Sequence, residues 1–253
     1  MKKFDFIIMS YIENIKNIKK ITATLLGQHC TACNQACFGS IVCPTCTDLI
    51  TKRRLYTVRC TRCAVILNKP TNESICTSCF THPPAFDTTV CVGDFNEPLS
   101  QLISQLKFSH HLIIASWCAE QLAYCLSHLP KQQQQFDLII PIPLHSNRLR
   151  ERGFNQSWEI IRHLPYITHQ KHSVLERLRD TPSQRELNAT ERMMNVKNAF
   201  MVDEKYLKCV KNKRILLVDD VITTTATAQA ASIALKAGGA AHITLASIAR
   251  VSY

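Results

Sequence analysis

The stretch ILLVDDVITTTATAQAA, from Ile215 to Ala231, joins an apolar run to an alanine-rich segment through two carboxylates and a cluster of threonines. The apolar run predicts a buried strand, and the alanine-rich segment predicts a helix. Adjacent carboxylates repel each other, and β-branched residues are poor helix formers. A strand-to-helix junction that combines both features therefore indicates a binding site.

On either side of this stretch, apolar runs alternate with helical patterns. Runs without polar alternation are typical of parallel strands buried on both faces, so an α/β fold with a mainly parallel sheet flanked by helices is predicted. The segment SNRLRERGFNQ is predicted to be a basic loop that enters a helix. The predicted strands lie in residues 86–95, 136–145, 172–180, 213–219 and 242–249, and Pro141 and Pro143 stop the second of these runs. The predicted helices span 99–108, 112–129 and 227–237.

The physical chemistry of the junction indicates which ligand it would bind. The N-terminus of the following helix carries unsatisfied N–H groups and a partial positive charge, which favour a phosphate. Asp219 and Asp220 would repel that phosphate, but they suit the hydroxyls of a sugar, with Mg²⁺ offsetting the charge. A phosphorylated ribose satisfies both requirements. The alternative is that the two carboxylates only end a strand and cap a helix.

Nine of the thirteen cysteines lie between Cys30 and Cys79, and eight of them form four C-x-x-C pairs. Two such pairs supply the four-sulfur tetrahedral shell that zinc prefers, and a filled shell makes the zinc structural. The spacing leaves sequential and interleaved pairing both open, and Cys37 is either a spare thiol or a substitute for Cys33. The predicted ligands are Cys30, Cys33, Cys43, Cys46, Cys60, Cys63, Cys76 and Cys79. The remaining cysteines, Cys91, Cys118, Cys125 and Cys209, lie in apolar contexts and are predicted to be core.

The formal net charge of +11 is unevenly distributed along the chain. Residues 1–85 carry 11 basic and 4 acidic residues, hence +7, and residues 86–253 carry 19 and 15, hence +4. A basic excess favours an anionic partner such as nucleic acid, although it also serves solubility. No apolar run approaches the length of a transmembrane helix, and Asp5 interrupts the N-terminal apolar stretch, so no membrane insertion and a cytoplasmic location are predicted.

Several blocks of the sequence together resemble the ComF family of competence-associated proteins. They are the cysteine pairs, PPAFD, LKF, DLIIPIPLH, RLRERGFNQ, RDTPSQREL, ERMMNVKNAF and LLVDDVITT, in that order. The last block also resembles the ribose-5-phosphate loop of type I phosphoribosyltransferases. The resemblance implies a phosphoribosyltransferase-like fold that binds phosphoribosyl pyrophosphate with Mg²⁺. It also implies a cytoplasmic role with single-stranded DNA, and with competence or recombination proteins, in natural transformation.

The resemblance assigns roles to residues of this chain by position. Asp219 and Asp220 would hold the ribose hydroxyls, and the segment Thr223, Thr224, Thr225, Ala226 and Thr227 would hold the 5-phosphate. The loop of Pro143, Leu144 and His145, which follows Pro141, would face the pyrophosphate. The arginines expected to contact the diphosphate or a nucleic-acid backbone are Arg148, Arg150, Arg152, Arg179 and Arg185. A solvated helix face is the alternative for the first three.

One position departs from the family pattern, which normally has glycine where this chain has Thr225. Glycine permits a positive φ and a close backbone approach to phosphate, whereas threonine resists both. Our hypothesis is that Thr225 weakens phosphate binding or substitutes a hydroxyl for a backbone contact. Measuring the affinity of Thr225→Gly for phosphoribosyl pyrophosphate tests it, since no gain would reject it.

Two functions are consistent with the sequence. The first is a DNA-processing factor or adaptor that uses the phosphoribosyl site to bind a ligand. The second is an active phosphoribosyltransferase that transfers ribose 5-phosphate to an unidentified acceptor and releases pyrophosphate. The absence of an identifiable general base and the presence of Thr225 favour the first. The predicted organisation is an amphipathic helix in 1–29, a cysteine-rich zinc-ribbon module in 30–82 and a phosphoribosyltransferase-like domain in 83–253.

Overall fold

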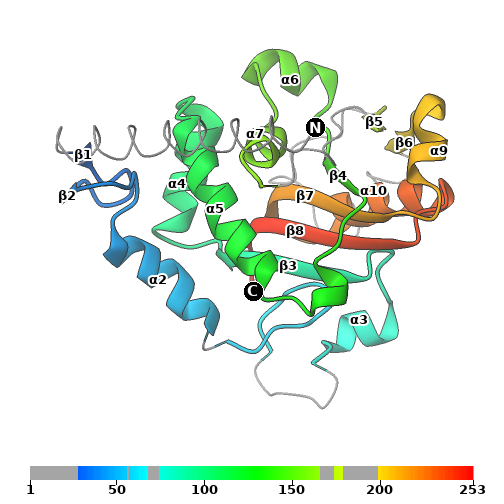
Figure 1. The fold of residues 1–253 in the computed structure, drawn as a ribbon, viewed down its shortest axis with the longest axis horizontal. Helices are drawn as coiled ribbons and strands as arrows, with labels where there is room; N and C mark the ends of the chain where they lie inside the picture. The colour runs from blue at the N-terminus through cyan, green and yellow to red at the C-terminus, as the bar shows by residue number, and fades with distance from the viewer. Residues whose placement is uncertain (1–27, 56, 68–73, 166–173, 179–198, 253) are drawn as a thin grey trace, which may run out of the picture. The chain divides into compact units, whose positions relative to one another are not determined.

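The computed structural model describes residues 28–55, 57–67, 74–165, 174–178 and 199–252 (Figure 1). The chain forms two compact units, which divide between Leu49 and Ile50. The first cysteine group lies in the smaller unit, and the second lies in the larger unit with the sheet. The helix predicted within residues 1–29 falls almost entirely outside the described residues. Among the described helices, none is both long and apolar enough to cross a bilayer.

A four-stranded parallel sheet forms the centre of the larger unit. Its strands are β3 (Thr88–Asp94), β8 (His242–Arg250), β7 (Arg214–Ile222) and β4 (Leu138–Pro141), side by side in that order. The strand β4 ends at Pro141, opposite Val218, whereas β7 continues beside β8 to Ile222. The acidic pair therefore lies on β7 immediately beyond the end of β4.

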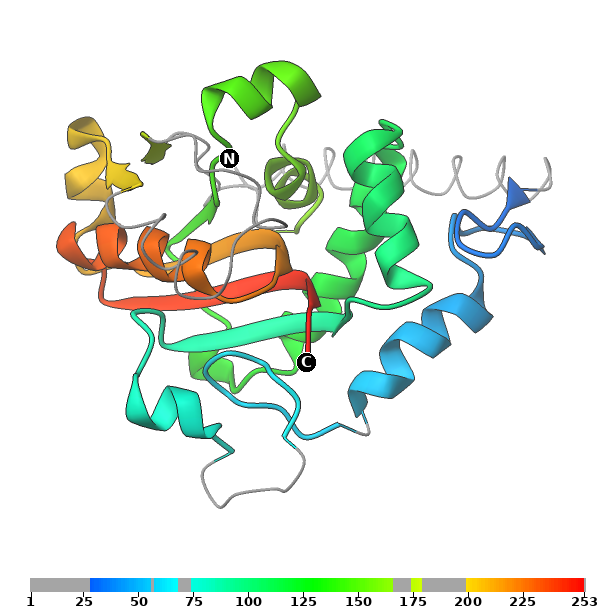
Figure 2. The ribbon, with the colours of Figure 1, turned by 180° about the vertical axis from the view of Figure 1, so that it is seen from behind.

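Helices cover both faces of this sheet, which confirms the predicted α/β class. Helices α5 (Ile113–Ser127) and α7 (Gln156–Arg162) lie on one face, and α10 (Ala226–Ala237) lies on the other, as the two opposite views show (Figures 1 and 2). α10 buries alanines, a serine and a leucine, and these small side chains let the helix approach the sheet closely. The core beneath α10 is dominated by aliphatic residues of the central strands.

Helix α4 (Leu99–Phe108) coincides with the segment predicted from its pattern. Its buried residues are Leu99, Leu102, Ile103 and Leu106, which recur every three or four positions and therefore form one stripe. The other described elements are β1 (Gln28–His29), β2 (Ala36–Cys37), α2 (Pro44–Leu55), α3 (Thr77–Thr81), η1 (Lys131–Gln133), α6 (Ser146–Arg152), β5 (Leu175–Arg177), β6 (Phe200–Val202), η3 (Glu204–Tyr206) and α9 (Leu207–Val210).

Three details of the prediction are wrong. The basic segment predicted to be a loop contains helix α6, which His145 caps at one end and Gly153 ends with a φ of 78°. A helix of seven residues is too short to show an apolar period, and none of its residues is buried. The strand predicted to end at Asp219 continues to Ile222, since its pairing with β8 carries it through the polar residues. Finally, Cys209 is exposed, although Cys91, Cys118 and Cys125 are buried as predicted.

Candidate functional site

The eight paired cysteines form two separate four-sulfur groups with sequential pairing. The first group comprises Cys30, Cys33, Cys43 and Cys46, and the second comprises Cys60, Cys63, Cys76 and Cys79. Within each group all sulfur atoms lie within 4.8 Å of one another. One sulfur–sulfur distance in each group is 3.7 Å. Four sulfurs bound at about 2.3 Å around zinc would be about 3.8 Å apart, so both groups fit a structural zinc ion.

Backbone N–H groups donate hydrogen bonds to sulfur atoms of both groups, which favours the thiolate form that binds a metal ion. The N–H of Cys43 donates to Cys30 Sγ at 3.2 Å, and the N–H of Cys76 donates to Cys60 Sγ at 3.3 Å. Cys37 does not belong to either group, because its thiol donates to the carbonyl oxygen of Ser40 at 3.1 Å. The structure therefore identifies Cys37 as the spare thiol.

The second cysteine group is attached to the sheet at β3. The N–H of Thr89 donates to the carbonyl oxygen of Thr61 at 3.0 Å, and its hydroxyl donates to that of Arg62. Arg59 forms a partly buried ion pair with Asp94 at 2.9 Å. These contacts connect the turn of the first C-x-x-C pair in this group to both ends of one strand.

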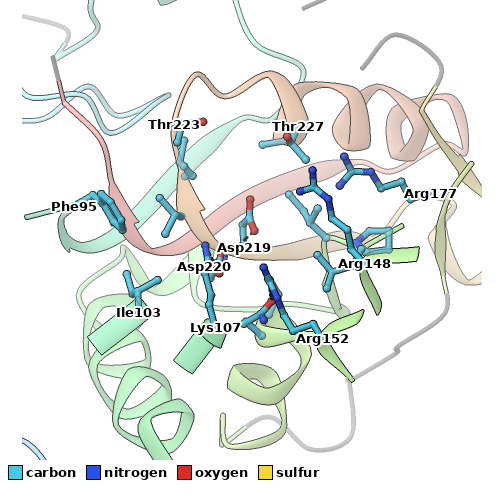
Figure 3. Close-up of a pocket in the computed structure, with 18 of the residues that line it drawn as sticks. Phe95, Ile103, Lys107, Arg148, Arg152, Arg177, Asp219, Asp220, Thr223 and Thr227 are labelled. Carbon is cyan, nitrogen blue, oxygen red and sulfur yellow. Dashed lines mark hydrogen bonds and ion pairs between the residues drawn. The ribbon is translucent and has the colours of Figure 1, made fainter. Parts of the chain in front are cut away.

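A pocket of about 760 Å³ opens at the carboxyl ends of β4 and β7 (Figure 3). Such a volume is typical of small-molecule sites. Most of the residues predicted to bind the ligand line this pocket, namely Pro143, Leu144, Arg148, Asp219, Asp220, Thr223, Thr225, Ala226 and Thr227. The other two, Thr224 and His145, are not part of the lining, and His145 Nδ1 instead accepts from the N–H of Asn147 at the start of α6.

The acidic pair lies at the centre of the pocket with a lysine beside it. Lys107 Nζ lies 2.8 Å from Asp220 Oδ2. Asp219 Oδ1 accepts a 2.9 Å hydrogen bond from the N–H of Asp220. Burial, together with the charge of Asp220, raises the pKa of Asp219 to about 7, although the charge of Lys107 opposes the rise. Two carboxylates can therefore remain adjacent because one is paired with a cation and the other readily holds a proton.

The threonine segment connects the end of β7 to the first turn of α10. Thr225 has a φ of 65°, which is the left-handed conformation that glycine adopts most easily. Its hydroxyl donates to the carbonyl oxygen of Thr224 at 2.5 Å. Because Thr223 and Thr227 both line the pocket, the helix N-terminus and the hydroxyls face the same space.

Cations gather on the side of the pocket away from Phe95 and Ile103, and the acidic pair lies between the two sides (Figure 3). Of the arginines predicted to face an anion, Arg148 and Arg152 line the pocket. Arg150 is exposed and donates to Asn147 Oδ1 at 2.5 Å. Arg179 and Arg185 lie outside the described residues.

Several residues of the lining carried no predicted role, among them Phe95, Ile103, Lys107, Gln156 and Arg177. Lys107 belongs to the LKF block and Gln156 to the RGFNQ block, so the resemblance marked their segments without indicating a contact. Gln156 Oε1 accepts from Arg152 at 2.9 Å. Its Nε2 is buried and has no hydrogen-bond partner among the described residues. An amide donor is therefore available at the pocket wall.

Asn155 fixes the position of this wall relative to the sheet. Its Nδ2 donates to the carbonyl oxygen of Ile142 at 3.0 Å, immediately after β4. Its Oδ1 accepts from the N–H groups of Ser157 and Trp158 and so caps α7. One buried side chain thus aligns the start of α7 with the loop that carries Pro143 and Leu144.

No protein-family model matches the chain. The chain is 36% identical over 171 residues to DNA utilization protein YhgH of Escherichia coli strain K12, which covers 66% of the chain and 74% of that protein. It is 35% identical over 186 residues to Competence protein F of Haemophilus influenzae, which covers 69% of the chain and 78% of that protein. It is 31% identical over 204 residues to DNA utilization protein YhgH of Salmonella typhimurium, which covers 79% of the chain and 86% of that protein. Each match spans more than two thirds of the relative.

Proposed function

Because the chain belongs to the ComF family of competence proteins, we propose that it is a cytoplasmic competence factor that assists the uptake and use of DNA. In this role it binds phosphoribosyl pyrophosphate and single-stranded DNA. The observation that carries the ligand assignment is the pocket itself. It unites a carboxylate pair, a hydroxyl-bearing helix N-terminus and an arginine wall.

Each part of phosphoribosyl pyrophosphate has a complementary surface in this pocket. The 5-phosphate would accept hydrogen bonds from the segment Thr223–Thr227 and the first N–H groups of α10. The ribose hydroxyls would donate to Asp219 and Asp220. The diphosphate would face Arg148, Arg152 and Arg177. Mg²⁺, when it accompanies the diphosphate, would offset the charge between these oxygens and the acidic pair.

Calorimetry with phosphoribosyl pyrophosphate and Mg²⁺ tests this proposal. Asp220→Asn should weaken binding at least tenfold, since an amide replaces one of the oxygens that accept from the sugar. A matched control is Asp203→Asn, because Asp203 also pairs with a lysine, Lys205, but lies outside the pocket. Silent calorimetry with the wild-type protein would refute the ligand assignment.

The apolar side of the same pocket favours a second candidate, an active phosphoribosyltransferase. Phe95 and Ile103 lie opposite the arginines, where a planar acceptor could stack next to the anomeric carbon (Figure 3). Pyrophosphate release distinguishes the two functions. Multiple turnovers with a nucleobase or with DNA would identify an enzyme, whereas stoichiometric binding without release would identify a ligand-binding factor.

A further inference from the structure

Two aromatic contacts join the end of α4 and the turn after it to the end of α6 and its following turn; Phe108, His110 and Arg152 line the pocket, and Phe154 lies beside His110. Phe108 is 61% exposed at the end of α4, and the Arg152 Cζ atom lies 5.4 Å from the centre of its ring. His110 and Phe154 have ring centres 5.4 Å apart. We call Phe108, His110, Phe154 and Arg152 the aromatic rim.

The rim has features that a purely structural turn would not need. Phe108 and His110 line the pocket and are both exposed, so that their ring faces are accessible to solvent. His110 also has a φ of 54°, a conformation that costs a non-glycine residue about 1–2 kcal/mol. Backbone strain of this kind concentrates at ligand-binding sites, where the surrounding structure maintains it.

Positive charge lies directly beside these rings. Arg152 donates to Gln156 Oε1 and its guanidinium lies over the ring of Phe108, so two contacts fix this charge in the wall of the pocket. Lys107 precedes Phe108 on α4, and Arg148 lies on the facing helix α6. Flat apolar faces next to fixed cations are the combination by which proteins bind single strands, since bases stack on the rings and phosphates pair with the cations.

We propose that the aromatic rim stacks unpaired bases of single-stranded DNA, with the backbone phosphates directed toward Arg148 and Arg152. The inference rests on the proposed function and assigns its DNA partner to specific residues. Duplex DNA does not fit the rim, because its base faces are already stacked on one another. The rim has no donor array that reads one base, so binding is not expected to depend on base identity.

The test compares binding of an oligothymidine of about 20 nucleotides with binding of an abasic strand of the same length, by fluorescence anisotropy at low salt. Phe108→Ala and Phe154→Ala should each weaken oligothymidine binding at least fivefold and leave abasic binding unchanged. Phe108→Tyr should retain wild-type affinity. A matched control is Tyr124→Ala, because Tyr124 is 52% exposed and pairs with His128 at 4.4 Å but does not line the pocket.

Several outcomes would overturn the rim assignment. One is that wild type and both phenylalanine-to-alanine variants bind oligothymidine equally well, and another is that wild type binds the abasic strand as tightly as oligothymidine. A third is that wild type binds duplex DNA or RNA more tightly than oligothymidine. A fourth is that Tyr124→Ala loses as much affinity for oligothymidine as the two phenylalanine variants. Phe154→Ala and Tyr124→Ala should both bind phosphoribosyl pyrophosphate like the wild type, which separates a local effect from misfolding. Failure of the wild type to bind phosphoribosyl pyrophosphate would refute the pocket ligand and would leave the strand-binding result valid.

Discussion

Arg250 Nε donates a 3.0 Å hydrogen bond to the carbonyl oxygen of Cys63. The same buried guanidinium donates to the carbonyl oxygens of Ile222, at 3.4 Å, and of Thr223. One side chain at the end of β8 thus connects the second cysteine group to the start of the threonine segment. The geometry of the phosphate side of the pocket therefore depends on a residue outside the pocket lining.

Replacing Arg250 should affect both stability and ligand binding. Arg250→Ala leaves the carbonyl oxygens of Cys63 and Thr223 without their guanidinium donor and should lower the free energy of unfolding by about 3 kcal/mol. It should also weaken phosphoribosyl pyrophosphate binding, because Thr223 loses its support. Urea denaturation and calorimetry measure the two effects. Arg250→Lys restores one donor and should recover part of each, whereas equal ligand affinity in all three proteins would contradict the connection.

The two cysteine groups should differ in their influence on the pocket. Cys33→Ser and Cys63→Ser each remove one sulfur ligand, so each should lower the zinc content from two ions per chain toward one. Only Cys63→Ser disturbs the turn that accepts from Arg250, so only this variant should weaken phosphoribosyl pyrophosphate binding. Zinc analysis and calorimetry on the purified proteins measure both quantities.

Cys37→Ser provides the control for this comparison. Its thiol donates to Ser40 and contributes no sulfur to either group, so the variant should retain both zinc ions and wild-type affinity. Loss of zinc from Cys37→Ser would show that the four-sulfur group forms with a different set of ligands. An equal loss of affinity for phosphoribosyl pyrophosphate in Cys33→Ser and Cys63→Ser would show that the pocket has no specific dependence on the second cysteine group.

Thr225→Gly should stabilise the protein, which is the opposite of the usual effect of glycine. A left-handed φ costs an L-residue about 1–2 kcal/mol, and glycine would relieve this strain. The greater freedom of glycine in the unfolded chain offsets part of the stability gained in this way. We expect a net gain of about 1 kcal/mol, or a rise in melting temperature of about 2–4 °C. Ligand affinity should rise as well if threonine restricts the approach of phosphate.

Thr227→Gly is the matched substitution, since Thr227 lies in the first turn of α10, where glycine costs up to about 1 kcal/mol. The two variants should therefore shift the melting temperature in opposite directions. A lower melting temperature for Thr225→Gly would mean that the hydroxyl contact with Thr224 outweighs the backbone strain.

The sequence predicted the parts of the fold that depend on local pattern. Unbroken apolar runs identified the four strands of the central sheet, and the departure from the family glycine drew attention to Thr225, where the structure has a positive φ. The pairing of Lys107 with Asp220 was not predictable, because the two residues come from distant segments that only the folded sheet brings together. The aromatic rim escaped detection for the same reason, since its members come from two separate turns.

The stability of the protein should depend on pH through Asp219. The pKa of Asp219 is raised from 3.8 to about 7, first by burial and then by the charge of Asp220. Between these two values the folded protein holds a proton that the unfolded chain has released, so the contribution of Asp219 to the free energy of unfolding falls as the pH rises. Asp219→Asn removes this titration while retaining the shape of the side chain.

The variant should therefore match the wild type in stability near pH 4 and exceed it near pH 8 by about 1 kcal/mol or more. Urea denaturation across this range measures the difference. At the same time Asp219→Asn should bind phosphoribosyl pyrophosphate more weakly, because the amide supplies one acceptor oxygen where the carboxylate supplies two. A wild-type pH dependence that persists in the variant would assign it to another group. The combination of higher stability and weaker binding would identify Asp219 as a carboxylate retained for the ligand at a cost to the fold.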